Sequence, residues 1–408
     1  MAQTEHPGVF ITTNGCRRRA LDSGRLADYF RLNGCRVLTS PADADYLIVV
    51  TCSFIESREQ ECYKIISDLQ QHRGEIIVLG CLPAIAEKTF PKLFNGRYLI
   101  TKDLVEIDKL FPDFKVKYRD VPDAHKVFGA FGTGRTGQRT FLQKLASFRP
   151  NRSTWNALRQ AIAARLSENT PTDLRAAHLR ISYGCVSNCA YCSIRKATGK
   201  LKSKTMDECL AEYRGLLEQG RRDFVILADD VGAYGLDLHS TFAELLKKMS
   251  EVDAGYNVGW QIRELHPNWA VKYRDEIGRH IASGKVNHIL CPIQSGSPKI
   301  LKLMNRFPDA EKVRDTLIGF RKAGLKRLDT HMIVGFPQET EEDFRASVDL
   351  VKAVQFNYVN VFPFWAGYDT IASKLDGQVD AAIAQDRIKI AVKEFEEAGI
   401  RISWDTPR

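Results

Sequence analysis

Short apolar runs rich in β-branched residues alternate with helical patterns from residue 8 to residue 110. Strands are predicted at residues 9–13, 36–38, 46–51 and 76–79, and the segments between them show the periodic apolar positions of amphipathic helices. This alternation is typical of an open α/β sheet with parallel strands. We therefore predict an N-terminal α/β domain over residues 1–112.

A second regular alternation of strand and helix patterns begins at His178. Strands are predicted near residues 178–184, 223–229, 256–262, 286–293, 327–334 and 358–364, and a helical pattern follows each of them but the last. Six β/α units predict a partial TIM-type barrel over residues 176–408, which ends in a C-terminal helix. In such a barrel, chemistry belongs at the carboxyl ends of the strands.

The segment between these regions, residues 113–175, interrupts the alternation. Gly, Pro and Thr cluster around residues 128–140, and an amphipathic helical pattern covers residues 140–166. Twelve Lys and Arg face five Asp and Glu in this segment, so it carries most of the net charge of +9. We predict a basic, partly helical linker or insertion. It is either an RNA-facing or cofactor-facing surface or a solvated basic helix.

Composition narrows the class of protein. A chain of 408 residues has room for two or three domains. No window contains the roughly 18 consecutive apolar residues of a membrane span, and the acidic start around Glu5 does not fit a secretory signal. We expect a cytoplasmic protein with no membrane association. Its positive charge permits an anionic partner but does not require one.

Ten cysteines are too sparse for a disulfide scaffold in a chain of this length. Grouped thiols in a reducing compartment more often serve metal or redox chemistry, so the grouping of the cysteines is informative. Six of them fall into two groups, described next. The other four fit the pattern of small buried core residues: Cys35, Cys62, Cys209 and Cys291.

The first group follows the first predicted barrel strand, in the run Tyr-Gly-Cys185-Val-Ser-Asn-Cys189-Ala-Tyr-Cys192. This spacing lets three sulfurs bind three irons of a four-iron four-sulfur cluster and leaves the fourth iron open. An open iron can chelate S-adenosylmethionine (SAM), whose one-electron cleavage releases a 5′-deoxyadenosyl radical. A zinc site is the alternative, but closed zinc sites need four ligands and no fourth Cys or His is adjacent.

In the second group, three predicted strands of the N-terminal domain run directly into Cys16, Cys52 and Cys81. The carboxyl ends of parallel strands share one edge of a sheet, where ligands bind. We therefore expect the three thiols to converge there. Three independent buried thiols are the alternative interpretation.

Four further runs accompany the cysteine loop. They are Ala-Asp-Asp-Val-Gly-Ala-Tyr-Gly at residues 228–235, Leu-His-Pro at 265–267, Pro-Ile-Gln-Ser-Gly-Ser at 292–297 with Met-Asn-Arg at 304–306, and Ile-Val-Gly-Phe-Pro-Gln-Glu-Thr at 333–340. With these runs the chain resembles the radical SAM superfamily, and more narrowly the methylthiotransferases that modify a tRNA adenosine or a ribosomal-protein aspartate. The resemblance implies an α/β fold class: a flavodoxin-like N-terminal domain followed by a partial (β/α)6 TIM-type radical SAM barrel.

The resemblance also implies the cofactors, which are SAM and two four-iron four-sulfur clusters. The second cluster falls to Cys16, Cys52 and Cys81, and no catalytic side chain is expected beyond the cluster ligands. Predicted cofactor contacts follow the barrel strands and are Tyr191, Asp229, Gln294, Ser295, Gly296, Gly335, Phe336 and Pro337. The last three are expected beside the adenine. Plain strand-to-helix turns are the alternative for the two glycine-containing runs, and His266 is either a turn residue before Pro267 or a functional one.

The implied reaction is the insertion of sulfur, as SCH3, into an unactivated C–H bond of an RNA, peptide or small-molecule acceptor. The implied partners are that acceptor and an electron donor such as flavodoxin or ferredoxin, and we expect a monomer or weak dimer. One alternative is radical sulfur insertion without methylation, or another radical reaction that uses the second cluster as an auxiliary. A non-enzymatic iron–sulfur protein that binds nucleic acid is a third reading, supported by the charge alone.

Four features depart from the family pattern. The basic insertion at residues 113–175 has no counterpart in it, and it either replaces the barrel described next or binds something else. The chain ends at Arg408, where the family usually continues into a C-terminal RNA-binding β-barrel, so we expect that barrel to be lacking. Arg19 stands where the family usually has Asn, and the run at residues 364–370 replaces a Ser-x-Arg-x-Gly-Thr run. Both changes lie next to the expected substrate-binding region. They therefore leave a peptide or a small molecule as an alternative acceptor to RNA.

Overall fold

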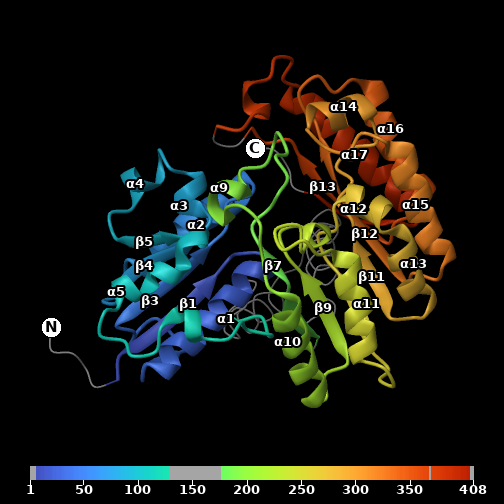
Figure 1. Cartoon of the computed structure of the whole chain (residues 1–408). Helices are drawn as coiled ribbons and strands as arrows, with labels where there is room; N and C mark the ends of the chain where they lie inside the picture. Colours follow the sequence, from blue (N-terminus) through green and yellow to red (C-terminus); the bar gives the residue numbers. More distant parts are fainter. Residues whose placement is uncertain (1–5, 129–175, 367–368, 405–408) are drawn as a thin grey trace, which may run out of the picture. The chain divides into compact units, whose positions relative to one another are not determined.

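The computed structural model describes residues 6–128, 176–366 and 369–404 (Figure 1). They form two compact units. The first contains residues 6–128 together with Ser193–Gly199, and the second contains the other described residues. The predicted basic insertion lies outside the described residues from residue 129 onward, and its predicted helix with it.

The first unit is built on a five-stranded parallel sheet in the order β2-β1-β3-β4-β5. Its strands are β1 (Gly8–Thr13), β2 (Arg36–Leu38), β3 (Tyr46–Thr51), β4 (Glu75–Gly80) and β5 (Arg97–Ile100). This strand order is that of flavodoxin-like folds, in which ligands bind near the point between β1 and β3 where the order reverses. The predicted open α/β sheet is confirmed, and β5 is a strand that the sequence analysis missed.

Helices connect these strands. The helical segments are α1 (Arg17–Leu32), α2 (Glu56–Leu69), α3 (Leu82–Ile85), α4 (Phe90–Leu93), η1 (Thr101–Glu106), α5 (Ile107–Leu110), η2 (Tyr118–Asp120) and α9 (Ile194–Thr198). Strand β3 is a nearly continuous buried apolar run, as expected for a central parallel strand covered on both faces. Helix α9 follows the cysteine loop in the chain and packs on α3 and η1 within this unit.

The second unit contains a seven-stranded parallel sheet in the order β14-β13-β12-β11-β10-β9-β6. Its strands are β6 (Ala177–Arg180), β9 (Asp223–Leu227), β10 (Gly259–Ile262), β11 (Val286–Leu290), β12 (Arg327–Val334), β13 (Tyr358–Pro363) and β14 (Arg401–Trp404). The partial barrel is confirmed. It has one more strand than predicted, because β14 pairs with β13 at the edge. A short antiparallel pair, β7 (Ser182–Tyr183) with β8 (Lys202–Ser203), lies beside the cysteine loop in the sequence.

Helices α10 to α17 follow the strands of the second unit (Figure 1). They are α10 (Met206–Glu218), α11 (Phe242–Val252), α12 (Pro267–Lys272), α13 (Arg274–Ala282), α14 (Pro298–Leu303), α15 (Ala310–Lys322), α16 (Glu341–Val354) and α17 (Ala381–Glu397). Capping boxes at Thr205, Thr241 and Thr340 start α10, α11 and α16, because each hydroxyl accepts the backbone N–H three residues later. Among the described residues, no helix is long and apolar enough to span a bilayer.

Candidate functional site

Three cysteines of the first unit lie at the carboxyl ends of adjacent strands. Cys16 follows β1 and caps α1, Cys52 directly follows β3, and Cys81 follows β4 and precedes α3. Strands β1, β3 and β4 are parallel neighbours, so these positions share one sheet edge. Burial, and then the nearby thiols of Cys16 and Cys81, raise the pKa of the Cys52 thiol well above its usual range. The structure therefore places the Cys16 and Cys81 thiols near that of Cys52. No group of three His, Cys, Asp or Glu side chains in the described part of the chain is arranged to hold a metal ion, so a cluster at these three thiols stays a prediction.

Two threonine hydroxyls tie the strand ends together at this edge. The Thr13 hydroxyl donates to the Val50 carbonyl (2.6 Å), and the Thr51 hydroxyl donates to the Leu79 carbonyl (2.8 Å). Gly80 has φ +112°, and a Cβ there would lie 2.5 Å from the Thr51 carbonyl oxygen. The backbones of β3 and β4 thus approach closely just before Cys52 and Cys81, and a side chain at position 80 would push them apart.

The second cysteine group lies in the second unit, in the loop after β7. Asp229, which follows β9, accepts the backbone N–H of Gly184 through Oδ2 (2.9 Å) and so fixes the turn before Cys185. Gly184 has φ +70°, a conformation that favours glycine. Asp229 was predicted as a cofactor contact. Its carboxylate holds the cysteine loop to the barrel.

The other side of the cysteine loop is held by the segment after α14. The Ala190 N–H donates to the Met304 carbonyl (2.9 Å), and the Asn305 side chain donates to the Asn188 carbonyl (2.9 Å). These bonds explain why the Met-Asn-Arg run accompanies the cysteine loop in the sequence. They fix the backbone on either side of Cys189.

Arg306 completes this run and lies against the thiols. Its Nη1 lies 3.5 Å from Cys189 Sγ and donates to the Tyr191 hydroxyl (3.2 Å), and its Nη2 donates to the Pro292 carbonyl (2.6 Å). Arg306 thus ties two residues of the cysteine loop to the segment that follows β11. Arg306 was not among the predicted site residues, although the Met-Asn-Arg run was a signal for it. Tyr191 was predicted as a cofactor contact, and its hydroxyl pairs with Arg306.

Gln294 stands out among the predicted SAM contacts. It follows β11, has φ +67°, and is 8% exposed. Its side-chain Oε1 is buried and has no hydrogen-bond partner within the described residues. A left-handed non-glycine residue costs on the order of 1 kcal/mol, and a buried acceptor without a donor is destabilising as well. Both costs are typical of a side chain held ready for a ligand.

Ser295 and Gly296 have structural partners on α16. The Ser295 hydroxyl bonds the Ser347 hydroxyl (3.1 Å), and the Gly296 N–H donates to the same Ser347 oxygen (2.8 Å). A Cβ on Gly296 would lie 2.3 Å from the Ala346 carbonyl oxygen. Close packing against α16 is therefore sufficient to explain this glycine, and a contact of either residue with SAM stays a prediction.

Replacing Gly296 by Ala should destabilise the second unit by about 1–3 kcal/mol, because the new methyl group meets the α16 backbone. Urea unfolding of the full chain measures this as a lower midpoint. Gly319→Ala on α15 is the matched control, since a Cβ there meets nothing within 4 Å. That control should be neutral or up to about 1 kcal/mol more stable. Equal midpoints for the two variants would contradict the packing described.

The turn after β12 contains the predicted adenine contacts. The Gly335 N–H donates to Glu339 Oε2 (2.8 Å), which also accepts from Arg387 Nη1 (3.0 Å). Burial raises the pKa of Glu339 to about 7, although Gly335 and Arg387 favour its charged form. Phe336 is fully buried and packs edge-on against Phe364, so its ring belongs to the core beneath the turn. Contacts of this turn with a cofactor stay a prediction.

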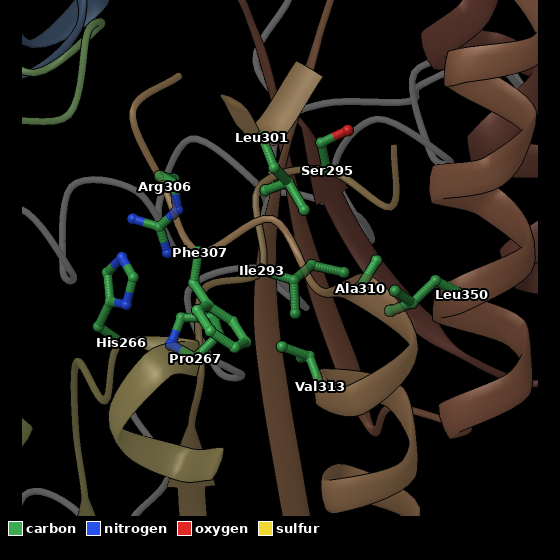
Figure 2. A pocket seen from close by; sticks show the side chains of 10 residues that line it. All are labelled: His266, Pro267, Ile293, Ser295, Leu301, Arg306, Phe307, Ala310, Val313 and Leu350. Atoms are coloured by element: carbon green, nitrogen blue, oxygen red, sulfur yellow. The ribbon is translucent and has the colours of Figure 1, made fainter. Parts of the chain in front are cut away.

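A small cavity opens beside Arg306 (Figure 2). Arg306 and His266 lie on one side of it, and aliphatic side chains such as Ile293 and Val313 line the other. His266 caps α12, where its Nδ1 accepts the Asn268 N–H (3.2 Å). Burial, and then Arg306, lower the pKa of His266 to about 2, so its imidazole is neutral. The open question at His266 is thus partly answered: it is a helix cap that also lines a cavity.

Comparisons with known proteins agree with this arrangement. Residues 179–351 match the family model of the radical SAM superfamily, and residues 8–100 match that of the uncharacterized protein family UPF0004. A ribosomal protein uS12 methylthiotransferase from Acidithiobacillus ferrooxidans is 28% identical over 402 residues, covering 96% of this chain and 82% of that protein. A probable threonylcarbamoyladenosine tRNA methylthiotransferase from Pyrococcus horikoshii is 27% identical over 407 residues, covering 98% and 85%.

Among solved structures, a radical S-adenosylmethionine methyltransferase from Kitasatospora setae superimposes with a TM-score of 0.57. It is 13% identical and covers 87% of this chain and 74% of that one, a likeness of fold. The fold, the cysteine loop and the two family matches together define a radical SAM enzyme. Within that class, the two family matches and these relatives support a radical SAM methylthiotransferase, which implies SAM and two four-iron four-sulfur clusters as cofactors.

Proposed function

We propose that this chain is a methylthiotransferase in which the two cysteine groups hold separate clusters. The single observation that carries this proposal is that each compact unit has its own group of three cysteines next to strand ends. Thiolate sulfur is the donor that iron–sulfur clusters take, and three thiols leave one iron free for another ligand. When bound, the clusters and SAM supply one-electron cleavage of SAM, hydrogen abstraction from the acceptor, and the sulfur and methyl groups to be transferred.

In this proposal Cys185, Cys189 and Cys192 hold the SAM-cleaving cluster. The chain's own groups orient it. Asp229 fixes the turn before Cys185, and Arg306 lies on Cys189 and Tyr191. These contacts hold the loop on either side, which supports a fixed arrangement of its three thiols.

Gln294 is the proposed SAM contact with the strongest support. Its buried Oε1 is an acceptor that suits the ammonium group or a ribose hydroxyl of SAM. The turn of Gly335, Phe336 and Pro337 is held by Glu339, which supports an ordered surface for the adenine. The Tyr191 hydroxyl is bonded to Arg306, and Ser295 and Gly296 are bonded to Ser347. These bonds suit residues that hold the SAM-binding loops in place.

Cys16, Cys52 and Cys81 hold the second cluster in this proposal. The acceptor is an RNA or a protein of the translation machinery, in line with the acceptors that the relatives' names specify. A small one-electron carrier such as flavodoxin or ferredoxin supplies the electron. We propose a cytoplasmic enzyme that acts as a monomer or weak dimer.

An acceptor panel tests this proposal. The reconstituted full chain is incubated anaerobically with SAM, a reductant, and either ribosomal protein uS12 or tRNA, and digests of each are searched for an added SCH3 group. We expect one of the two to be modified. Modification of neither, with SAM still cleaved, would place the acceptor outside the translation machinery. Sulfur added without a methyl group would instead favour the alternative of sulfur insertion alone.

A further inference from the structure

A fourth thiol lies beside the three cysteines of the first unit. Cys62 is on α2, is fully buried, and donates its S–H to the Cys52 carbonyl (3.0 Å) and to Asn14 Oδ1 (3.2 Å). A cysteine has a single S–H, which is a weak hydrogen-bond donor, so the two oxygens share this one donor.

Asn14 bonds both Cys52 and helix α2. Its Oδ1 also accepts the Cys52 N–H (3.2 Å), and its Nδ2 donates to the Arg58 carbonyl on α2 (2.9 Å). The two side chains together therefore bond both main-chain polar groups of Cys52. Asn14 lies two residues before Cys16, so the same set of bonds links the loop of Cys16 to the loop of Cys52.

The hydrogen bonds of the Cys62 thiol are not explained by core packing alone. A buried thiol that only fills space requires no polar acceptor, whereas the Cys62 thiol has two. Both acceptors belong to the segments that carry Cys16 and Cys52. Groups behind the ligands of a metal site commonly set ligand orientation, and hydrogen bonds near the sulfurs tune the reduction potential of an iron–sulfur cluster.

We propose that Cys62, together with Asn14, is a positioning residue for the second cluster: its S–H holds the Cys52 main chain so that the three ligand thiols keep one geometry. The inference rests on the proposed function of Cys16, Cys52 and Cys81. Cys62 itself binds no iron. Removal of its S–H leaves the buried Cys52 carbonyl and Asn14 Oδ1 without that donor, which loosens the Cys52 loop and takes a donor dipole away from the cluster.

The test uses the full chain with Cys185, Cys189 and Cys192 replaced by alanine, so that the second cluster alone is observed. Cys62→Ala, Cys62→Ser and Cys35→Ala are added separately to this background. Serine keeps a hydrogen-bond donor at the position. Cys35 is the matched control, because it is a buried thiol of the same unit that precedes β2 at the other end of the strands. The readouts are iron per chain, the electron paramagnetic resonance spectrum, the midpoint potential, and the rate of iron loss to a chelator.

We expect Cys62→Ala to change the spectrum, lower the midpoint potential and speed iron loss about tenfold, with Cys62→Ser close to the background and Cys35→Ala unchanged. A spectrum, potential and iron loss unchanged in Cys62→Ala would overturn the proposal. So would a serine variant as impaired as the alanine variant, since that result would make the sulfur itself the requirement. Absence of iron from the background protein is a different failure, because it would refute the second cluster and this inference with it.

Discussion

Replacement of Cys185, Cys189 and Cys192 by alanine should abolish formation of 5′-deoxyadenosine and reduce the iron content from about eight to about four atoms per chain. The reason is that these thiols are the proposed ligands of the cluster that cleaves SAM. No other cysteine is within the Cys185 loop to replace them. Anaerobic reconstitution, followed by iron analysis and chromatography of the nucleoside product, measures both quantities.

Cys209→Ala is the control for this first prediction. Cys209 is a fully buried thiol on α10 of the same unit, and it lies outside the loop. This variant should keep the parental iron content and the parental yield of 5′-deoxyadenosine. Cleavage of SAM by the triple variant at the parental rate would refute the assignment of the loop.

Replacement of Cys16, Cys52 and Cys81 by alanine should abolish sulfur transfer but leave the cleavage of SAM intact. We expect iron to fall again to about four atoms per chain, while 5′-deoxyadenosine is still formed and no methylthio product appears. The two activities separate because the second group belongs to the first unit, whereas the SAM-cleaving loop belongs to the second. Iron content, nucleoside yield and acceptor mass are measured on the same sample.

Cys35→Ala is the control for this second prediction. It removes a buried thiol from the first unit without changing the three strand ends that carry Cys16, Cys52 and Cys81. Its product yield should equal that of the parent protein. If the triple variant transferred sulfur as well as this control does, the second cluster would have no part in the reaction. If the triple variant lost 5′-deoxyadenosine too, the two groups would not be separable.

Local pattern was sufficient to predict much of the fold. The β3 run is nearly continuously apolar because a central parallel strand is covered on both faces, and this pattern made the strand recognisable in the sequence. Strands β5 and β14, each a four-residue strand at a sheet edge, were missed. The location of Cys16, Cys52 and Cys81 at one sheet edge was predictable because each thiol lies within three residues of the end of a strand.

Tertiary partners were beyond prediction from the sequence. Ser295 meets Ser347, which is 52 residues away, and Glu339 meets Arg387, which is 48 residues away. No local pattern specifies such pairs, since each joins a turn that follows a strand to a helix that comes later in the chain. Cys62 was set aside as a core thiol for the same reason: its proposed role rests on contacts of α2 with the loops after β1 and β3.

The central claim is that one enzyme places both sulfur and a methyl group on one acceptor carbon. The most direct test is anaerobic turnover of the reconstituted full chain with SAM deuterated in its methyl group, together with the unmodified form of the acceptor that the panel identifies. We expect a single adduct in which SCD3 replaces one hydrogen, formed together with 5′-deoxyadenosine. A labelled methyl group attached without sulfur, or formation of the adduct without cleavage of SAM to 5′-deoxyadenosine, would contradict it.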